Sequence, residues 1–277
     1  MTAVTTTAGR ARASDARAGF GATLASEWTK ITSLRSTYIM VGLALILGIG
    51  MTALITAVIG ATWSDWTPAQ QADFDPVTTS FFGWIFSGIL LSVLGVTTVA
   101  SEYSSGMIRV TLTATPRRGR VLMAKVLIIA AVTLVVGTIA TIGMFLAGQT
   151  IFSSYGIEAA SLGDEEALRS VLGLSIGSPI FPLIGAALAV LLRNTAGAIT
   201  TVMALIFAPS IFGPLLPAWW QENVLRFLPG PASDNLALFN DADALLYMAP
   251  AAAAAVAIGW VILFLGVAYV MLTRRDA

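Results

Sequence analysis

Six stretches of the chain, each longer than 20 residues, contain no Asp, Glu, Lys or Arg. They are residues 36–64, 76–101, 126–157, 170–192, 194–221 and 244–273. An α-helix needs about 20 mostly apolar residues to cross the hydrocarbon core of a bilayer. Windows such as residues 38–59 and 126–148 are apolar all round and lack the alternation of membrane-barrel strands. The sequence therefore predicts an all-α membrane protein with six transmembrane helices.

Composition excludes most enzyme chemistry. Of the 277 residues, 57% are hydrophobic and 11% are charged, and there is no histidine and no cysteine. Disulfides, thiolate or imidazole metal sites and histidine-based acid–base catalysis are therefore ruled out. The only lysines, Lys30 and Lys125, do not follow glycine, so no P-loop for ATP exists. We expect no catalytic residue, metal or cofactor in this chain, and the net charge of zero argues against a nucleic-acid partner.

Charge sorting predicts the topology, because cytoplasmic segments near span ends carry an excess of Lys and Arg. With both termini in the cytoplasm, 13 of the 15 basic residues fall on that side. These are Arg10, Arg12, Arg17, Lys30, Arg35, Arg109, Arg117, Arg118, Arg120, Lys125, Arg193, Arg274 and Arg275. By the same assignment, 11 of the 15 acidic residues lie outside. We therefore expect a multi-pass protein with both termini and residues 101–125 in the cytoplasm.

Three regions follow from these patterns. Residues 1–19 predict a disordered tail, because their Ala, Thr, Gly and Arg composition cannot build a core. Residues 20–36 predict an amphipathic helix lying in the membrane interface, although this segment could instead only extend the first span. Residues 37–273 form the transmembrane domain, with the spans predicted at 37–60, 78–101, 124–148, 170–192, 195–216 and 250–273. In the amphipathic segment, Trp28 lies on the apolar face, whereas Glu27 and Lys30 lie on the other face.

Prolines and aromatic residues mark the outer half of the domain. The fourth span contains the sequence SPIFP (178–182), and the fifth contains Pro209 and Pro214, so we expect both to be kinked or locally unwound. The segment between the fifth and sixth spans is too polar to cross the membrane. Its Trp219 and Trp220 predict short helices in the outer interface.

The loop of residues 101–120 differs from the other loops. Glu102 ends the second span on a side with few acidic residues, the apolar residues that follow have helical spacing, and Pro116 is expected to end this short helix. One interpretation is a functional element that contacts a partner; the other is a solvated basic loop that only sets topology. Charged residues are absent from the middle of every span, which disfavours a proton-driven transporter.

The same loop resembles the loop between the second and third spans of permeases of the type-2 ABC (ATP-binding cassette) exporter family. The family pattern is E-(Y/F)-x-x-G-x-(I/L)-R followed by L-x-(A/T/S)-(T/S)-P-x-(R/S)-R. The matching residues are Glu102, Tyr103, Gly106, Ile108, Arg109, Leu112, Thr115, Pro116, Arg117 or Arg118, and later Lys125. The segments EWTKITSLRSTYIM (27–40) and RFLPGPASDNLALF (226–239) are similar to the start of the first helix, especially in actinobacterial members, and to the outer segment before the last span.

The resemblance implies a permease subunit of the bacterial cell membrane, in contact with membrane lipid, that pairs with a second permease copy or a related permease. Two separate ATPase subunits would hold ATP and Mg. Residues equivalent to 103–119 form the coupling helix of that family. The residues implied to couple to the ATPase are Glu102, Tyr103, Gly106, Ile108, Arg109, Leu112, Pro116, Arg117 and Arg118. The translocation cavity is implied to lie between the second and fifth spans of the two halves. Its possible lining residues are Phe82, Phe86, Leu90, Met203, Phe207 and Phe212, each of which could instead face lipid or pack.

Two functional classes stay open after these steps. The first is the membrane subunit of an ATP-driven exporter of an apolar or amphipathic compound, such as a drug, lipid or peptide. The second is a membrane scaffold or immunity-type protein that binds a partner and transports nothing. Co-purification of an ATPase would separate them, because a scaffold does not need one.

Overall fold

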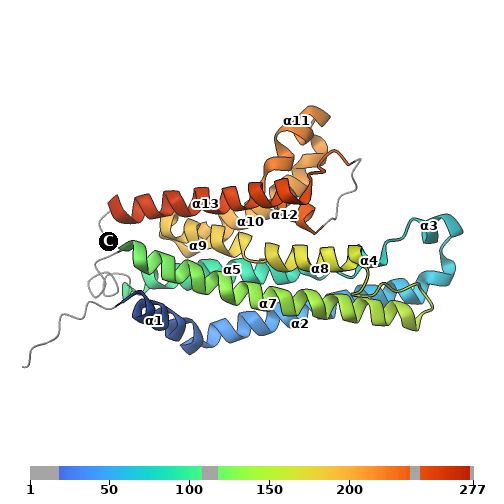
Figure 1. Ribbon diagram of the computed structural model, residues 1–277, viewed down its shortest axis with the longest axis horizontal. Helices are drawn as coiled ribbons and strands as arrows, with labels where there is room; N and C mark the ends of the chain where they lie inside the picture. The colour runs from blue at the N-terminus through green and yellow to red at the C-terminus, as the bar shows by residue number, and fades with distance from the viewer. Residues whose placement is uncertain (1–18, 108–117, 238–243, 275–277) are drawn as a thin grey trace, which may run out of the picture.

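The computed structural model describes residues 19–107, 118–237 and 244–274, which form helices and no β-strand (Figure 1). The α-helices are α1 (Phe20–Ser33), α2 (Arg35–Thr62), α3 (Pro68–Ala72), α4 (Pro76–Thr79), α5 (Trp84–Ser104), α7 (Arg118–Ser154), α8 (Glu165–Gly177), α9 (Ile180–Leu192), α10 (Thr195–Phe212), α11 (Ala218–Asn223), α12 (Pro229–Leu236) and α13 (Pro250–Arg274). Single 3₁₀ turns are η1 (Trp63–Asp65), η2 (Gly213–Leu215) and η3 (Leu225–Phe227). The all-α prediction is confirmed.

Within the described residues, six helical segments are long and apolar enough to cross a membrane, as the uncharged stretches predict, so the chain is a multi-pass membrane protein. They are Arg35–Asp65, Trp84–Ser104, Arg118–Ser154, Glu165–Leu192, Thr195–Leu215 and Pro250–Arg274. The second span begins at Trp84 rather than at residue 78, because Asp75 caps the separate short helix α4 and a turn follows it. The third helix is longer than the predicted 124–148 at both ends.

The two proline-containing spans behave differently. The fourth is interrupted at Ser178 and Pro179, which separate α8 from α9. Pro179 cannot donate a hydrogen bond to the Ser175 carbonyl, and the Ser178 hydroxyl donates to that oxygen instead, at 2.7 Å. In the fifth span, α10 continues through Pro209 and ends at Phe212, where η2 replaces the helix. The predicted break is therefore present in the fourth span and lies only at the end of α10 in the fifth.

Helices α5 and α9 form the centre of the bundle. Their contact depends on Gly95, because a Cβ atom there would lie 2.2 Å from the carbonyl oxygen of Pro182. Val96 of α5 and Ile184 of α9 are fully buried in the same core. Helices α2 and α7 pack on one side of α5, and α10 and α13 pack against α9. The glycine at this contact lets the two helix backbones approach closely, and small residues commonly have this role between helices in membranes.

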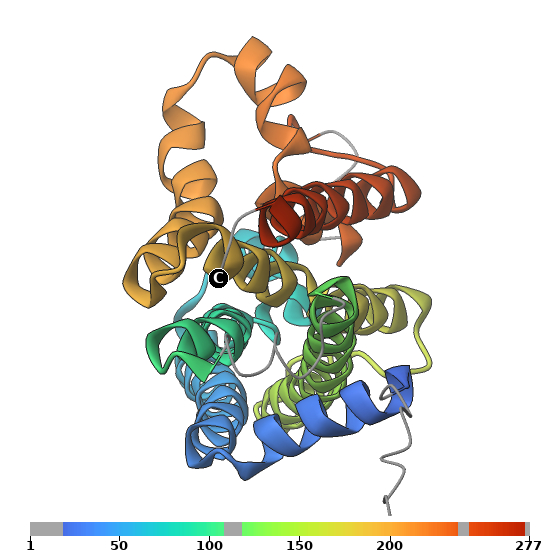
Figure 2. The ribbon, with the colours of Figure 1, turned by 90° about the vertical axis from the view of Figure 1, so that its left-hand side faces the viewer.

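Helix α1 lies across one end of the bundle, beside the first turns of α7 (Figures 1 and 2). We call this the α1 end; it also contains the last turns of α5 and α13. The face of α1 that packs on the bundle includes Glu27 and Ile31, whereas Trp28 is 51% exposed. The packed face is therefore mixed: Glu27 and Lys30 meet charged partners from α5 and α7, whereas Ile31 joins the hydrophobic core.

Candidate functional site

Four charged side chains meet at the α1 end. Lys125 Nζ of α7 lies 2.5 Å from Glu27 Oε2 of α1 and 2.6 Å from Glu102 Oε1 of α5. Lys30 Nζ of α1 lies 2.6 Å from Glu27 Oε1 and 2.8 Å from the same Glu102 oxygen. We call Glu27, Lys30, Glu102 and Lys125 the buried charge cluster. It joins three helices and uses both lysines of the chain.

The burial of this cluster makes its pairing necessary. The side chains of Glu27, Glu102 and Lys125 are at most 5% exposed, whereas that of Lys30 is 26% exposed. Burial lowers the pKa of Lys30, but its hydrogen bonds to Glu102 and Glu27 outweigh this effect, so the pKa lies above its ordinary value. Two positive and two negative charges make the cluster neutral, which reduces the cost of removing them from water. Only Glu102 Oε2 is buried there without a hydrogen-bond partner.

The two ends of the loop between α5 and α7 are attached to other helices. At the first end, the Arg193 guanidinium lies 5.7 Å from the centre of the Tyr103 ring, a cation–π contact to the last turn of α5. At the second end, Arg118 Nη1 donates a hydrogen bond to the Leu272 carbonyl of α13, at 3.0 Å. Between them, Gly106 has a φ of 70°, a backbone conformation that favours glycine.

Of the residues implied to couple to an ATPase, the structure brings Glu102, Tyr103, Gly106 and Arg118 to the α1 end. The other five lie outside the described residues: Ile108, Arg109, Leu112, Pro116 and Arg117. Sequence reasoning did not assign Glu27, Lys30 or Arg193 to this site. The rarity of lysine, together with acidic residues on the basic side, was the available signal for the cluster.

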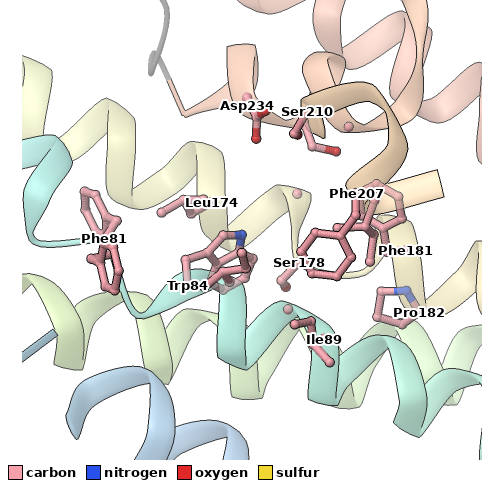
Figure 3. A pocket seen from close by; sticks show the side chains of 17 residues that line it. Phe81, Trp84, Ile89, Leu174, Ser178, Phe181, Pro182, Phe207, Ser210 and Asp234 are labelled. Carbon is pink, nitrogen blue, oxygen red and sulfur yellow. The ribbon is translucent and has the colours of Figure 1, made fainter. Parts of the chain in front are cut away.

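A second feature is a cavity of about 310 Å³ on the α12 side of the bundle (Figure 3). Residues of α5, α8, α9, α10 and α12 surround it. Its wall consists of Phe81, Phe82, Trp84, Ile85, Gly88, Ile89, Leu174, Gly177, Ser178, Phe181, Pro182, Ile206, Phe207, Ser210, Gly230, Ser233 and Asp234. In Figure 3, Asp234 and Ser210 lie along one side, and Trp84 and Ile89 lie across from them. The cavity is mostly apolar and carries one acidic side chain.

The cavity contains two of the six residues proposed from the sequence, Phe82 and Phe207. The other four are not in its wall. Leu90 and Met203 pack against core clusters, Phe86 is half-buried, and Phe212 is 59% exposed. The sequence indicated which spans could line a cavity, but the packing of α5 and α10 against their neighbours decides which of their side chains reach this one.

Asp234, which the charge sorting assigns to the outer side, lines this cavity in the structure. Part of Asp234 remains exposed, while protein atoms pack around the rest of the residue, and it borders the cavity. Burial raises the pKa of Asp234 to about 6, from an ordinary value of 3.8. The sequence LPGPASDN offered no signal for this position, because α12 places the side chain only by packing against α8 and α13.

A comparison with protein families gives a match. The model of a family described as "Protein of unknown function (DUF2705)" matches residues 64–277, which is more than half of the chain. The matched region includes the cavity, Glu102 and Lys125, but not Glu27 and Lys30 of α1. No curated protein matches the chain.

Proposed function

The chain belongs to the DUF2705 family, and we propose that it is the membrane-spanning permease subunit of an ABC exporter. A separate ATPase subunit would bind ATP and Mg and hydrolyse ATP. The permease would use that energy to export an apolar or amphipathic compound. Two permease copies, or this chain and a related one, would form the membrane part of the transporter in the bacterial cell membrane.

The observation that carries this proposal is the buried charge cluster beside the loop that resembles a coupling element. Glu102 is two residues before the end of α5, and Lys125 is two turns into α7, so the cluster joins the helices on both sides of the loop. Tyr103 and Arg118 attach the loop ends to α9 and α13 through Arg193 and Leu272. A force applied to the loop would therefore move several helices together. A loop that only set topology would need none of these attachments.

The cavity supports the proposal in a second way. It is lined in part by α5 and α10, the second and fifth spans, and the resemblance implies that these two spans of each half line the translocation cavity. Aromatic side chains such as Phe81, Trp84, Phe181 and Phe207 line it and suit an apolar compound. In this arrangement α1 would lie in the cytoplasmic interface with both termini in the cytoplasm. The short helices α11 and α12 would lie toward the outer interface.

The first experiment looks for the ATPase. The tagged chain, purified from its native membrane in a mild detergent, should bring with it an ATPase subunit, and the complex should hydrolyse ATP with vanadate sensitivity. In proteoliposomes, the complex should export at least one dye from rhodamine 6G, Nile red and anilinonaphthalene sulfonate, which are positive, neutral and negative. If no ATPase is purified with the chain, the exporter proposal is rejected and the scaffold is favoured. If a proton gradient alone drives export, the chain is a secondary transporter and not an ABC permease.

The second experiment tests the loop with a matched pair of variants. Gly106 and Gly156 both have positive φ, 70° and 77°, and a Cβ atom at either would meet nothing within 4 Å. Alanine at either position therefore introduces similar strain, roughly 1–2 kcal/mol, at opposite ends of the bundle. We expect Gly106→Ala to reduce export more than ATP hydrolysis and Gly156→Ala to leave export near normal. Equal effects would contradict a coupling role of the loop.

Two further variants also test the loop, but each of them removes a stabilising contact as well. Glu102→Ala would leave the lysines of the buried charge cluster short of a partner, and charge reversal at Arg118 would break the bond to Leu272. We still expect both to uncouple ATP hydrolysis from export, but their expression and insertion must be measured first. Only a variant that inserts normally reports on coupling.

A further inference from the structure

Among the described residues that line the cavity, none neutralises the carboxylate of Asp234. It is the one charged group among the residues that line the cavity, and no ion pair or side-chain hydrogen bond joins it to any described residue of the chain. Helices α5, α8, α9 and α10 contribute only apolar residues, glycine and serine to the cavity wall. Because Asp234 is exposed and borders this apolar wall, its unpaired negative charge is open to a cation that enters the cavity.

Two of the serines around the cavity do not donate hydrogen bonds to this carboxylate. The Ser178 hydroxyl donates to the carbonyls of Thr133 and Ser175, at 2.9 and 2.7 Å. The Ser233 hydroxyl donates to the Pro229 carbonyl, at 2.8 Å. Their hydrogens are therefore committed to the backbone. Ser210, which lies beside Asp234 in Figure 3, has a hydroxyl free to contact a ligand.

We infer that this cavity binds an amphipathic organic monocation, with its charged group at Asp234 and its apolar body against the aromatic wall. Trp84, Phe181 and Phe207 provide ring faces that attract a cation and ring area that packs against a hydrocarbon body. The volume of about 310 Å³ suits one small organic molecule. Naming this ligand as a substrate rests on the proposed function, whereas its binding does not.

The ionisation of Asp234 agrees with this inference. Because its pKa is about 6, the carboxylate is mostly ionised at neutral pH and protonated near pH 5. A bound cation stabilises the ionised form, so cation affinity should fall as the pH decreases through this pKa. A neutral ligand would show no such dependence from this group.

Tetraphenylphosphonium and tetraphenylborate are suitable probes, because they have nearly the same shape and opposite charge. Binding is measured by titration calorimetry on the purified chain in lipid nanodiscs, with empty nanodiscs subtracted, at about pH 7.5 and about pH 5. We expect saturable binding of the cation only, weakened at the lower pH. Equal binding of both ions, or none of the cation, would overturn the inference.

Variants locate the site. Asp234→Asn should weaken cation binding about tenfold, corresponding to about 1.4 kcal/mol, and should remove the pH dependence, whereas Asp234→Glu should retain much of the affinity. Glu222→Gln, a matched control at an exposed acid of α11, should change nothing. Gly88→Leu should abolish binding by filling the cavity, since a Cβ atom there meets only Trp84, at 3.9 Å. Unchanged cation binding in Asp234→Asn would overturn the assignment.

The outcomes separate this inference from the proposed function. Cation binding without an associated ATPase would support the binding site and reject the exporter. If the complex exports only neutral or negative dyes when it hydrolyses ATP, the exporter is supported, but cations are not its substrates. If Asp234→Asn reduces the export of rhodamine 6G while ATP hydrolysis stays normal, both the exporter and the cation site are supported.

Discussion

Replacement of Lys125 by methionine tests the buried charge cluster. Methionine retains most of the length of the lysine stem but removes its charge. The variant would leave Glu27 and Glu102 with Lys30 as their only partner in the cluster, so one buried negative charge would be unbalanced. We expect α1 to detach from α5 and α7 more often than in the unaltered chain.

The expected size follows from the geometry. Removing one partner of a buried ion pair costs about 3–5 kcal/mol. The lower end applies here, because Lys30 remains 2.6 and 2.8 Å from the two acids and is partly exposed. A cost of about 3 kcal/mol raises the population of detached α1 by roughly two orders of magnitude.

Limited proteolysis measures this opening. The peptide bond after Lys30 lies inside α1, so trypsin reaches it only when the helix detaches and unwinds. When opening and closing are fast, the cleavage rate follows the population of the open form. Arg169→Met is the control, since it breaks an exposed ion pair with Glu165 and should cost less than about 1 kcal/mol.

A double variant tests the explanation itself. Lys125→Met combined with Glu27→Gln restores a neutral cluster and keeps the Lys30–Glu102 pair at 2.8 Å. The double variant should therefore be more stable than the sum of the two single changes by about 2 kcal/mol. Additive effects would refute the claim that charge balance holds α1 in place.

Three further predictions concern other parts of the chain. Because the chain has no cysteine, an introduced cysteine at Asp164 should react with an impermeant thiol reagent outside intact cells and one at Ser104 should not; labelling of Ser104 would overturn the topology. Since the folded-state pKa of Asp234 is raised, stability should fall as the pH rises from about 4 to about 6, and Asp234→Asn should unfold at a higher temperature at neutral pH by tryptophan fluorescence. Gly95→Val should separate α5 from α9 and lower the yield of folded protein in size-exclusion chromatography, whereas Gly266→Val, where a Cβ atom meets nothing within 4 Å, should not.

The spans were predictable because their signal is local. Each uncharged stretch is long enough to cross the bilayer as a helix, and the cost of an unpaired backbone in lipid favours a helix for such an apolar stretch. The break before α9 was also predictable, since Pro179 lacks the donor that a continuous helix needs. Boundaries such as Trp84 were not, because Asp75 and the turn after α4 compete with the span for the same residues.

The functional features were only partly visible in the sequence. Glu102 stood out as an acid at the end of a span that needed a partner, and the structure supplies two, Lys125 and Lys30. Separations of 23 and 72 residues hide these pairs from any local pattern. For the same reason, Phe82 and Phe207 were proposed without Asp234, which the chain brings to them from another helix.

The sequence by itself determined that most of this protein lies in a lipid bilayer and how many spans it has. It also excluded chemistry that requires histidine or cysteine side chains. Hydrophobicity, missing residue types and prolines act at their own positions, so they can be interpreted one segment at a time. Tertiary structure alone decided which face of α1 is buried, which charges balance each other and which acid faces the cavity. These outcomes depend on distances between helices that are remote in the chain, and packing sets those distances.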